Sequence, residues 1–197
     1  MSLKHAILGF LSFQSLSGYD LKKAFDRSVQ HFWPANQSQI YRTLAALNDE
    51  GFVSQEVIER EDRLDKKLYH ITEAGRTELH TWLSTPLPPV DSREPFLIQL
   101  YFGGKLSDEE LIQVIHHEIE HYEQILQIFG VHYLTYKEQM NTAREPRAFF
   151  LSVLTLEGGI ANGVANLTFL RSALARIQSG EYTFTDFDFE NILNQPE

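Results

Sequence analysis

Two long runs of apolar residues with a seven-residue repeat constrain the fold of this chain more than any other feature. The first run covers residues 112–140 and the second covers residues 149–177, and in both the apolar positions follow one another at alternating steps of three and four. This spacing is typical of helices that pack as in a coiled coil. Residues 141–145 and Pro146 interrupt the pattern, so we predict two antiparallel helices joined by a short turn.

The same hairpin is expected to hold a dimer together. Additional apolar residues, among them Leu151, Leu154 and Phe169, widen the two stripes beyond what one seam can cover. A second copy of the hairpin would cover them in a two-fold dimer, and the short apolar segment 96–102 is an alternative or additional cover. The residues predicted to hold the dimer are Ile112, Ile115, Ile119, Tyr122, Leu126, Leu156, Ile160, Leu167, Leu170 and Leu174.

Charge is distributed unevenly between the hairpin and the part of the chain before it. The 197 residues carry 17 basic and 27 acidic side chains, a net charge of −10 that would usually argue against contact with nucleic acid. Residues 1–83, however, hold 10 basic and 11 acidic side chains, whereas residues 84–197 hold 7 and 16. We therefore expect a nearly neutral domain at 1–83, a proline-containing linker at 84–95, a helical dimerisation domain at 96–180 and a C-terminal tail at 181–197.

The elements predicted in the first domain follow the order of a winged helix-turn-helix. After a first helix, Ser17 and Asn36 are good N-cap residues for a second and a third helix. Two runs of strand composition, 52–59 and 66–71, then flank a charged turn and predict a hairpin, and Thr72 starts a fourth helix. The expected fold is mostly α, with three helices and a β-hairpin wing followed by the long antiparallel helical hairpin. A small α+β domain with the same order by accident is the alternative.

In a winged helix-turn-helix the third helix enters the major groove, and the exposed residues of this one suit that role. If Ile40, Leu44 and Leu47 face the core, the free face near the helix start carries no acidic residue. Gln and Arg have bidentate geometry for base edges, and cations near the wing would contact phosphates. The predicted base contacts are Gln37, Ser38, Gln39, Tyr41 and Arg42. The predicted backbone contacts are Tyr19, Lys22, Arg63, Lys66 and Lys67.

Four short sequence blocks of the first domain are shared with a known family. They are residues 17–25 (SGYDLKKAF), 38–44 (SQIYRTL), 51–53 (GFV) and 65–76 (DKKLYHITEAGR). In this order and spacing they resemble the PadR-like transcriptional regulators of bacteria, and the long C-terminal part resembles the branch to which a virulence activator belongs. The resemblance implies a winged-helix DNA-binding domain, a helical dimerisation domain, regulation that is most often repression, and a small aromatic or phenolic effector in many members.

One departure from the family lies in the wing. Many members have a Gly-Arg-Pro-like turn before the paired basic residues, whereas this chain has Asp62-Arg63-Leu64-Asp65. The basic pair is kept, but three acidic residues share the turn, so a merely solvated loop is an alternative to a phosphate contact.

The segment His117-Glu118-Ile119-Glu120-His121 matches the HExxH pattern of zinc peptidases. Because Ile119 belongs to the apolar stripe, the two histidines are expected on the outer face of the helix, where no walled cavity and no obvious third ligand would complete a catalytic zinc site. We predict no enzyme activity, no cofactor and no metal site. Adventitious metal binding at the surface and a metal-dependent hydrolase are the alternatives.

The sequence has no cysteine and no run of about 20 apolar residues that would span a membrane, so we expect a cytoplasmic protein without a membrane partner. The predicted function is a homodimeric, sequence-specific DNA-binding transcriptional regulator, a repressor that responds to an effector. Its partners would be double-stranded DNA, a second copy and a small aromatic effector bound near Phe32, Trp33, Phe96, Tyr101 and Phe102. A helical adaptor that uses a winged helix for protein contacts is the rival class.

Overall fold

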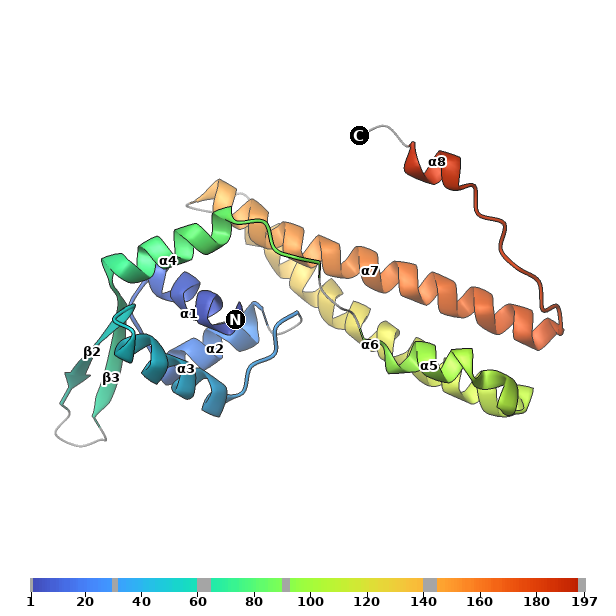
Figure 1. Cartoon of the computed structure of the whole chain (residues 1–197), viewed down its shortest axis with the longest axis horizontal. Coiled ribbons are helices and arrows are strands. Elements are labelled where there is room, and N and C mark those ends of the chain that lie inside the picture. Colours follow the sequence, from blue (N-terminus) through green and yellow to red (C-terminus); the bar gives the residue numbers. More distant parts are fainter. Residues whose placement is uncertain (1, 30–31, 60–64, 90–92, 140–144, 195–197) are drawn as a thin grey trace. The chain divides into compact units, whose positions relative to one another are not determined.

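The computed structural model describes residues 2–29, 32–59, 65–89, 93–139 and 145–194, and the chain divides into two compact units (Figure 1). Unit 1 is Met1–Asp91 and unit 2 is Ser92–Glu197. The elements of unit 1 are α1 (Ser2–Phe13), β1 (Leu16–Ser17), α2 (Gly18–Arg27), α3 (Gln37–Asp49), β2 (Val53–Ile58), β3 (Lys66–Ile71) and α4 (Glu73–Ser84). Arg63, predicted to contact phosphate, lies outside the described residues.

Side-chain caps fix the starts of α2 and α3. Ser17 Oγ accepts a hydrogen bond from the backbone N–H of Asp20 at 3.2 Å. Asn36 and Gln39 form a capping box, in which each side-chain oxygen accepts from the other residue's backbone N–H at 2.9 Å. After α3, Gly51 has a φ of 74°, in the left-handed region that glycine adopts at little cost. The predicted helix starts at Ser17 and Asn36 are therefore confirmed.

The sheet of unit 1 consists of the predicted hairpin and one additional edge strand. β2 and β3 pair antiparallel, with Val53 opposite Ile71 and Ile58 opposite Lys66. β1 pairs antiparallel with the other side of β3, which gives the order β1-β3-β2. β1 was not predicted, because two residues are too few to show the alternation that identifies a strand.

The four helices and the sheet of unit 1 enclose one hydrophobic core. Its buried members are Ile7, Leu8, Leu11, Leu21, Phe25, Ile40, Leu44, Leu47, Val53 and Tyr69. Since α3 contributes Ile40, Leu44 and Leu47 to this core, the opposite face of α3 is left to solvent. Gly75 lets α4 approach the chain before β2 closely, because a Cβ at this position would lie 2.1 Å from the carbonyl oxygen of Phe52.

Unit 2 is built on a long helical hairpin. Its elements are α5 (Pro95–Tyr101), the 3-10 turn η1 (Gly103–Lys105), α6 (Asp108–Gln139), α7 (Pro146–Ser179) and α8 (Phe189–Leu193). Ser107 and Glu110 cap the start of α6 reciprocally, at 2.9 and 3.3 Å, and Pro146 opens α7 as the sequence predicts. α7 ends at Gly180, whose φ is 69°.

α6 and α7 pack against each other along the predicted seam. Ile115, Ile119, Leu156, Leu167 and Leu170 are buried there, and Ile112, Tyr122, Leu126, Ile160 and Leu174 are half-buried. The sequence assigns these ten residues to dimerisation, whereas the structure places the buried ones between two helices of the same chain. Heptad spacing shows that a helix has a partner but not which chain supplies it, so the assignment of these ten residues to dimerisation stays a prediction.

α7 has much apolar surface that the seam does not cover. Among the described residues it is the one helix long and apolar enough, by length and composition, to cross a membrane. The sequence interpretation had identified no such segment. Only 11% of its most apolar window is buried within the chain. Its exposed large apolar residues are Phe150, Leu151, Leu154, Val164 and Phe169.

Candidate nucleic-acid interface

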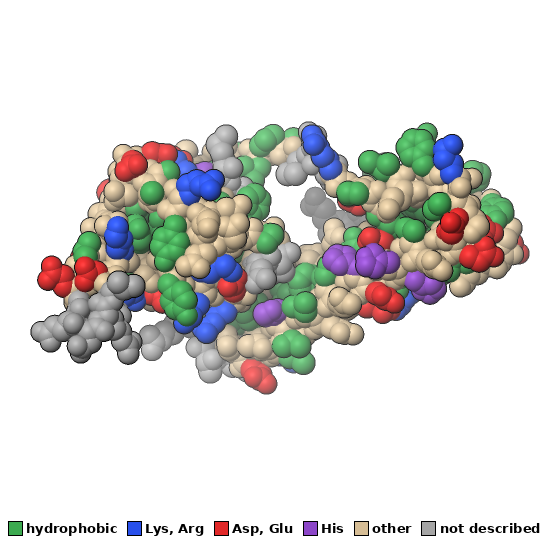
Figure 2. Space-filling view, turned by 90° about the horizontal axis from the view of Figure 1, so that it is seen from below, with side chains coloured by type: hydrophobic (Ala, Val, Ile, Leu, Met, Phe, Trp, Pro, Cys, Tyr) green, Lys and Arg blue, Asp and Glu red, His purple; other side chains and the backbone are tan. Residues whose placement is uncertain are grey.

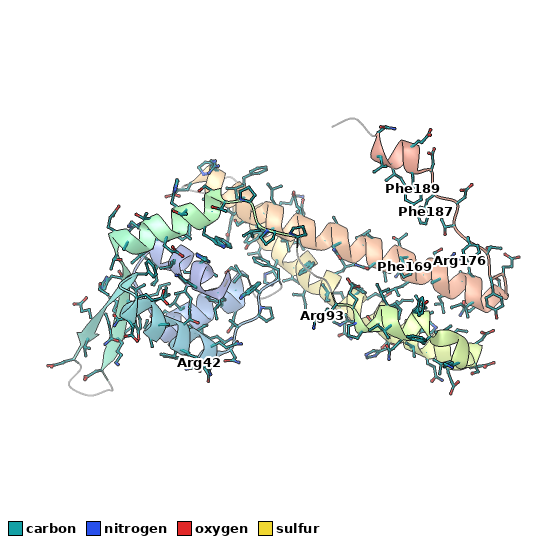
Figure 3. The ribbon with its side chains drawn as sticks, in the orientation of Figure 1. Arg42, Arg93, Phe169, Arg176, Phe187 and Phe189 are labelled. Atoms are coloured by element: carbon teal, nitrogen blue, oxygen red, sulfur yellow. The ribbon has the colours of Figure 1, made fainter. Side chains whose placement is uncertain are left out.

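The exposed surface of α3 carries all five predicted base-contact residues. Gln37, Ser38, Gln39, Tyr41 and Arg42 are solvent-exposed. Ser38, Gln39, Tyr41 and Arg42 lie away from the buried stripe, whereas Gln37 is in register with Ile40 and Leu44 and is exposed at the first turn. Arg42 projects from the surface of α3 (Figure 3) and makes no ion pair within the part of the chain that the structure describes. This face therefore offers one free guanidinium group and several neutral polar groups, which suits hydrogen bonding to base edges.

Gln39 has a structural bond as well as an exposed position. Its side-chain oxygen accepts from the backbone N–H of Asn36 in the capping box at 2.9 Å. To bond a base with both carboxamide atoms, Gln39 must release this N–H. Gln37, Ser38 and Arg42 carry no such bond in the described structure, so they are available for bases without loss of a cap.

Tyr41 packs on α2 at Gly18. A Cβ at Gly18 would lie 2.5 Å from Cε1 of Tyr41, so the ring fits there only because residue 18 has no side chain. Tyr41 also lines a cleft of about 410 Å³ together with Tyr19 of α2 and with Lys66 and Lys67 of β3. The structure thus brings four of the ten predicted DNA contacts into one cleft between the helix-turn-helix and the wing.

Two of the predicted phosphate contacts are paired with carboxylates. Lys66 Nζ lies 2.8 Å from Asp20 Oδ2, and Lys22 pairs with Asp26 one turn along α2. Lys66, and after it Ser17, lowers the pKa of Asp20 below its usual value. Lys67 makes no ion pair within the described residues, so it is a basic group of the wing that phosphate can approach without competition.

Lys23 is a basic residue near this cleft that sequence reasoning did not single out. Its Nζ lies 4.4 Å from the ring centroid of Tyr19, in a cation–π contact on the exposed side of α2. The spacing of four residues between Tyr19 and Lys23 on one helix was the available signal.

The HExxH segment does not form a metal centre in the described structure. His117 and His121 are exposed on α6, and Figure 2 shows histidine side chains gathered on the surface of unit 2. No group of three potential ligands occurs among the described residues. His121 packs edge-on against Tyr122, with ring centroids 5.6 Å apart.

A pocket of about 330 Å³ lies within unit 2, between α5, α6 and α7. Its lining includes the cationic Arg93, the aromatic rings of Phe96, Tyr122 and Phe169, and His121. The carboxylates of Glu94 and Glu118 also line it. Burial raises the pKa of the Tyr122 phenol, and these two carboxylates raise it further.

The predicted aromatic cluster is divided between the units. Phe96 lines this unit 2 pocket, while Phe32 and Trp33 line a separate, almost entirely apolar pocket of about 340 Å³ within unit 1. Tyr101 and Phe102 are 84% and 57% exposed. The unit 2 pocket has one cationic side chain, Arg93, on its lining, beside the carboxylates of Glu94 and Glu118.

Comparison with known proteins identifies the family of the chain. The model of the transcriptional regulator PadR-like family matches residues 7–81, and that of the virulence activator alpha C-terminal domain matches residues 92–178. The negative transcriptional regulator PadR of Bacillus subtilis is 33% identical over 180 residues, which cover 89% of this chain and 97% of that protein. The chain belongs to the PadR-like family of transcriptional regulators.

Solved structures share the fold of this PadR-like regulator over most of its length. Bacillus subtilis PadR in complex with operator DNA has a TM-score of 0.77 at 31% identity, covering 90% of this chain and 99% of PadR. PadR in complex with p-coumaric acid has a TM-score of 0.71 at 32% identity, covering 89% and 95%. The virulence activator AphA of Vibrio cholerae has a TM-score of 0.74 at 26% identity, covering 90% and 99%.

Membership of this family confirms the predicted fold and the predicted class of function. The PadR-like regulator is a winged-helix, DNA-binding regulator of transcription that acts as a homodimer, and its relatives are regulators rather than enzymes. The roles of individual residues in DNA contact and in dimerisation stay predictions.

Proposed function

We propose that this regulator represses transcription in the cytoplasm by inserting α3 of each protomer into the major groove of an operator half-site. The acid-free, exposed face of α3 beside the cleft that holds Lys66 and Lys67 is the observation that carries this proposal. The relative from Bacillus subtilis is named a negative regulator and has a structure with operator DNA, which supports repression as the direction of control.

The proposal divides the contacts by chemistry. Arg42, Gln37 and Ser38 contact base edges. Gln39 joins them where a base replaces the backbone N–H of Asn36 as its hydrogen-bond partner. Tyr41 contacts the backbone side of the groove from its place in the cleft. The phosphate contacts are Tyr19, Lys22 and Lys67, with Lys23 added by the structure. Lys66 joins them only where phosphate displaces Asp20 from its ion pair.

Two alanine variants test this division on an operator selected from random DNA. Arg42→Ala should cost about 1–3 kcal/mol and relax the choice of base at one position. Lys67→Ala should weaken binding to all sequences alike and reduce the salt slope by about 1, because one phosphate contact is lost. Arg76→Ala removes the same charge from an exposed position on α4 and is the control, expected to bind as the unchanged protein does.

Identical behaviour of the Arg42 and Lys67 variants would refute the division into base and phosphate contacts. If no DNA sequence is bound in a salt-dependent way, the proposal fails as a whole. Purified protein that binds a protein partner through α3 instead would support the adaptor class.

We propose that the dimer is held by the exposed apolar face of the hairpin rather than by the seam. Leu151 and Leu154 on α7 are each more than 40% exposed in the single chain, although the chain is a homodimeric regulator. Leu154→Asp should therefore raise the dissociation constant of the dimer, measured by sedimentation, while the helix content of the monomer is kept. A dimer as tight as that of the unchanged protein would refute this assignment.

We further propose an aromatic carboxylate as the effector, bound in the unit 2 pocket. The volume of about 330 Å³, the aromatic walls and the guanidinium of Arg93 match a ring and its carboxylate. PadR of Bacillus subtilis has a structure with p-coumaric acid, which is the probe of choice. Calorimetric titration should show binding that Arg93→Ala weakens at least about tenfold, since it loses a charge-assisted contact. Lys105→Ala, an exposed cation outside the pocket, is the control, and equal binding by both variants would refute the site.

A further inference from the structure

The segment after the hairpin differs in composition from the rest of the chain. Residues 181–197, the tail, follow the family-model matches, the second of which ends at residue 178. The tail contains five acidic residues, four aromatic residues and no basic residue. Half of the net charge of −10 therefore lies in these 17 residues, interleaved with aromatic rings.

The aromatic side chains of the tail lie in solvent. Phe184 is 99% exposed, and Phe187 and Phe189 are 59% and 65% exposed. α8 places Phe189, Ile192 and Leu193 at i, i+3 and i+4, the spacing of anchor residues in short helices that dock into apolar grooves. Such side chains gain free energy when an apolar surface covers them.

The start of the tail is held against the end of the hairpin, and the chain then turns back and rises clear of α7 to α8 (Figure 1). After the left-handed turn at Gly180, Arg176 Nη1 donates to the carbonyl of Thr183 at 3.1 Å and to Thr185 Oγ1 at 3.4 Å. The hydroxyl of Tyr182 donates to Asp108 Oδ2, at the start of α6, at 2.8 Å. The tail therefore starts from the C-terminal end of α7 and heads back toward the N-terminal end of that helix.

This direction leads to the unit 2 pocket. Phe169, which lines the pocket, precedes Arg176 by seven residues, so the two lie on the same face of α7 about 10 Å apart. Phe187 and Phe189 follow Thr185 by two and four residues, a reach of about 7–13 Å for extended chain. The residues involved are labelled in Figure 3.

The pocket and the tail also match in chemistry. The pocket offers aromatic walls and Arg93, which makes no ion pair within the described residues, and the tail offers phenylalanine rings that alternate with Asp186 and Asp188. Glu94 and Glu118 on the pocket lining repel an acidic segment, which restricts a favourable carboxylate position to the side of Arg93.

We infer that the tail is an internal ligand of its own chain: it closes over the unit 2 pocket, with a phenylalanine ring of Phe187 or Phe189 against Phe169 and an aspartate paired with Arg93. The docked tail excludes other occupants from the pocket. This contact is independent of DNA recognition, and an effector bound in the same pocket competes with it.

Disulfide trapping tests the contact, because the chain has no native cysteine. Asn166→Cys on the pocket lining and Glu190→Cys on α8 should form an intrachain disulfide under mild oxidation. The control pair is Glu138→Cys, near the far end of α6, with Glu190→Cys. The first pair should react at least about tenfold faster, since a tethered segment that docks has an effective concentration in the millimolar range. Equal rates for the two pairs would overturn the inference, and so would a disulfide that joins two chains.

A charge swap tests the proposed ion pair in the same assay. Arg93→Glu should slow disulfide formation by the first pair, and adding Asp186→Lys and Asp188→Lys should restore it. Arg93 is solvent-exposed, so these variants are expected to fold, and circular dichroism checks the helix content. A trapping rate that does not respond to Arg93→Glu, or that the swap fails to restore, would overturn the pairing with Arg93.

Discussion

Replacing Asp20 with Asn should raise the affinity for DNA while lowering the stability of unit 1. In the structure Asp20 Oδ2 accepts from Ser17 Oγ at 2.7 Å and pairs with Lys66 Nζ at 2.8 Å. Asn keeps an acceptor for Ser17 but removes the charge. Lys66 is then released for a phosphate, and a negative charge is removed from the cleft that we propose to face the DNA backbone.

The substitution lowers the unfolding free energy and raises the affinity for DNA, and these two quantities are measured in separate experiments. The Lys66 and Asp20 side chains are 31% and 35% exposed, so solvent screens their pairing and its loss should cost no more than about 1 kcal/mol of unfolding free energy. Because Lys66 lowers the pKa of Asp20, this contribution is present above the ordinary carboxyl pKa and is lost as the pH falls through the lowered one. One more phosphate contact should steepen the salt slope by about 0.9 and strengthen binding about three- to tenfold.

Fluorescence anisotropy of a labelled operator at several salt concentrations, together with urea unfolding, measures both effects. Asp49→Asn is the matched control: it removes the same charge from the far end of α3, and Asp49 itself makes no ion pair among the described residues. It should raise affinity only slightly and leave the slope unchanged. A lower affinity or an unchanged slope for Asp20→Asn would show that Lys66 does not reach a phosphate, and an equal gain for Asp49→Asn would show a general charge effect.

Four further substitutions probe packing in both units and one ion pair in unit 1. Leu170→Ala, at a position 2% exposed in the seam, should cost about 2–5 kcal/mol in urea unfolding, and a loss well below this range would contradict the seam. Gly75→Ala should destabilise unit 1 strongly because the added Cβ meets a backbone oxygen. Gly9→Ala on α1, where a Cβ would have nothing within 4 Å, should stabilise unit 1 by about 0.5–1 kcal/mol. Similar effects of the two substitutions would contradict the close approach of α4 to Phe52. Glu78 has a pKa lowered by the hydrogen bond from His5 and then by a lysine, so Glu78→Gln should be less stable than the unchanged protein near neutral pH and equal to it well below pH 4.5. A stability gap that does not narrow on acidification would refute this role.

Sequence patterns predicted the local structure well where the cause is local. Ser17, Asn36 and Ser107 were expected to start helices, and each caps the predicted helix through bonds to residues three positions away. Such bonds depend only on residue type and spacing, and both are visible in the sequence.

Contacts between distant residues were not predictable in the same way. The pairing of Lys66 with Asp20 joins residues 46 positions apart, so nothing in the sequence around either one indicates that it is engaged. The packing of Tyr41 on Gly18 likewise depends on how closely α2 and α3 approach. The candidate DNA face could be named from the sequence, but which of its cations are free required the fold.

The capping role of Gln39 couples the choice of operator to the folding of α3. A substitution at this position changes a potential base contact and the start of the helix together, so variants with new sequence preference there would also carry a stability loss of about 1 kcal/mol. Positions 37, 38 and 42 carry no such penalty in the described structure. Divergence of operator specificity among descendants of this regulator should therefore proceed first through these three positions, with Gln39 retained.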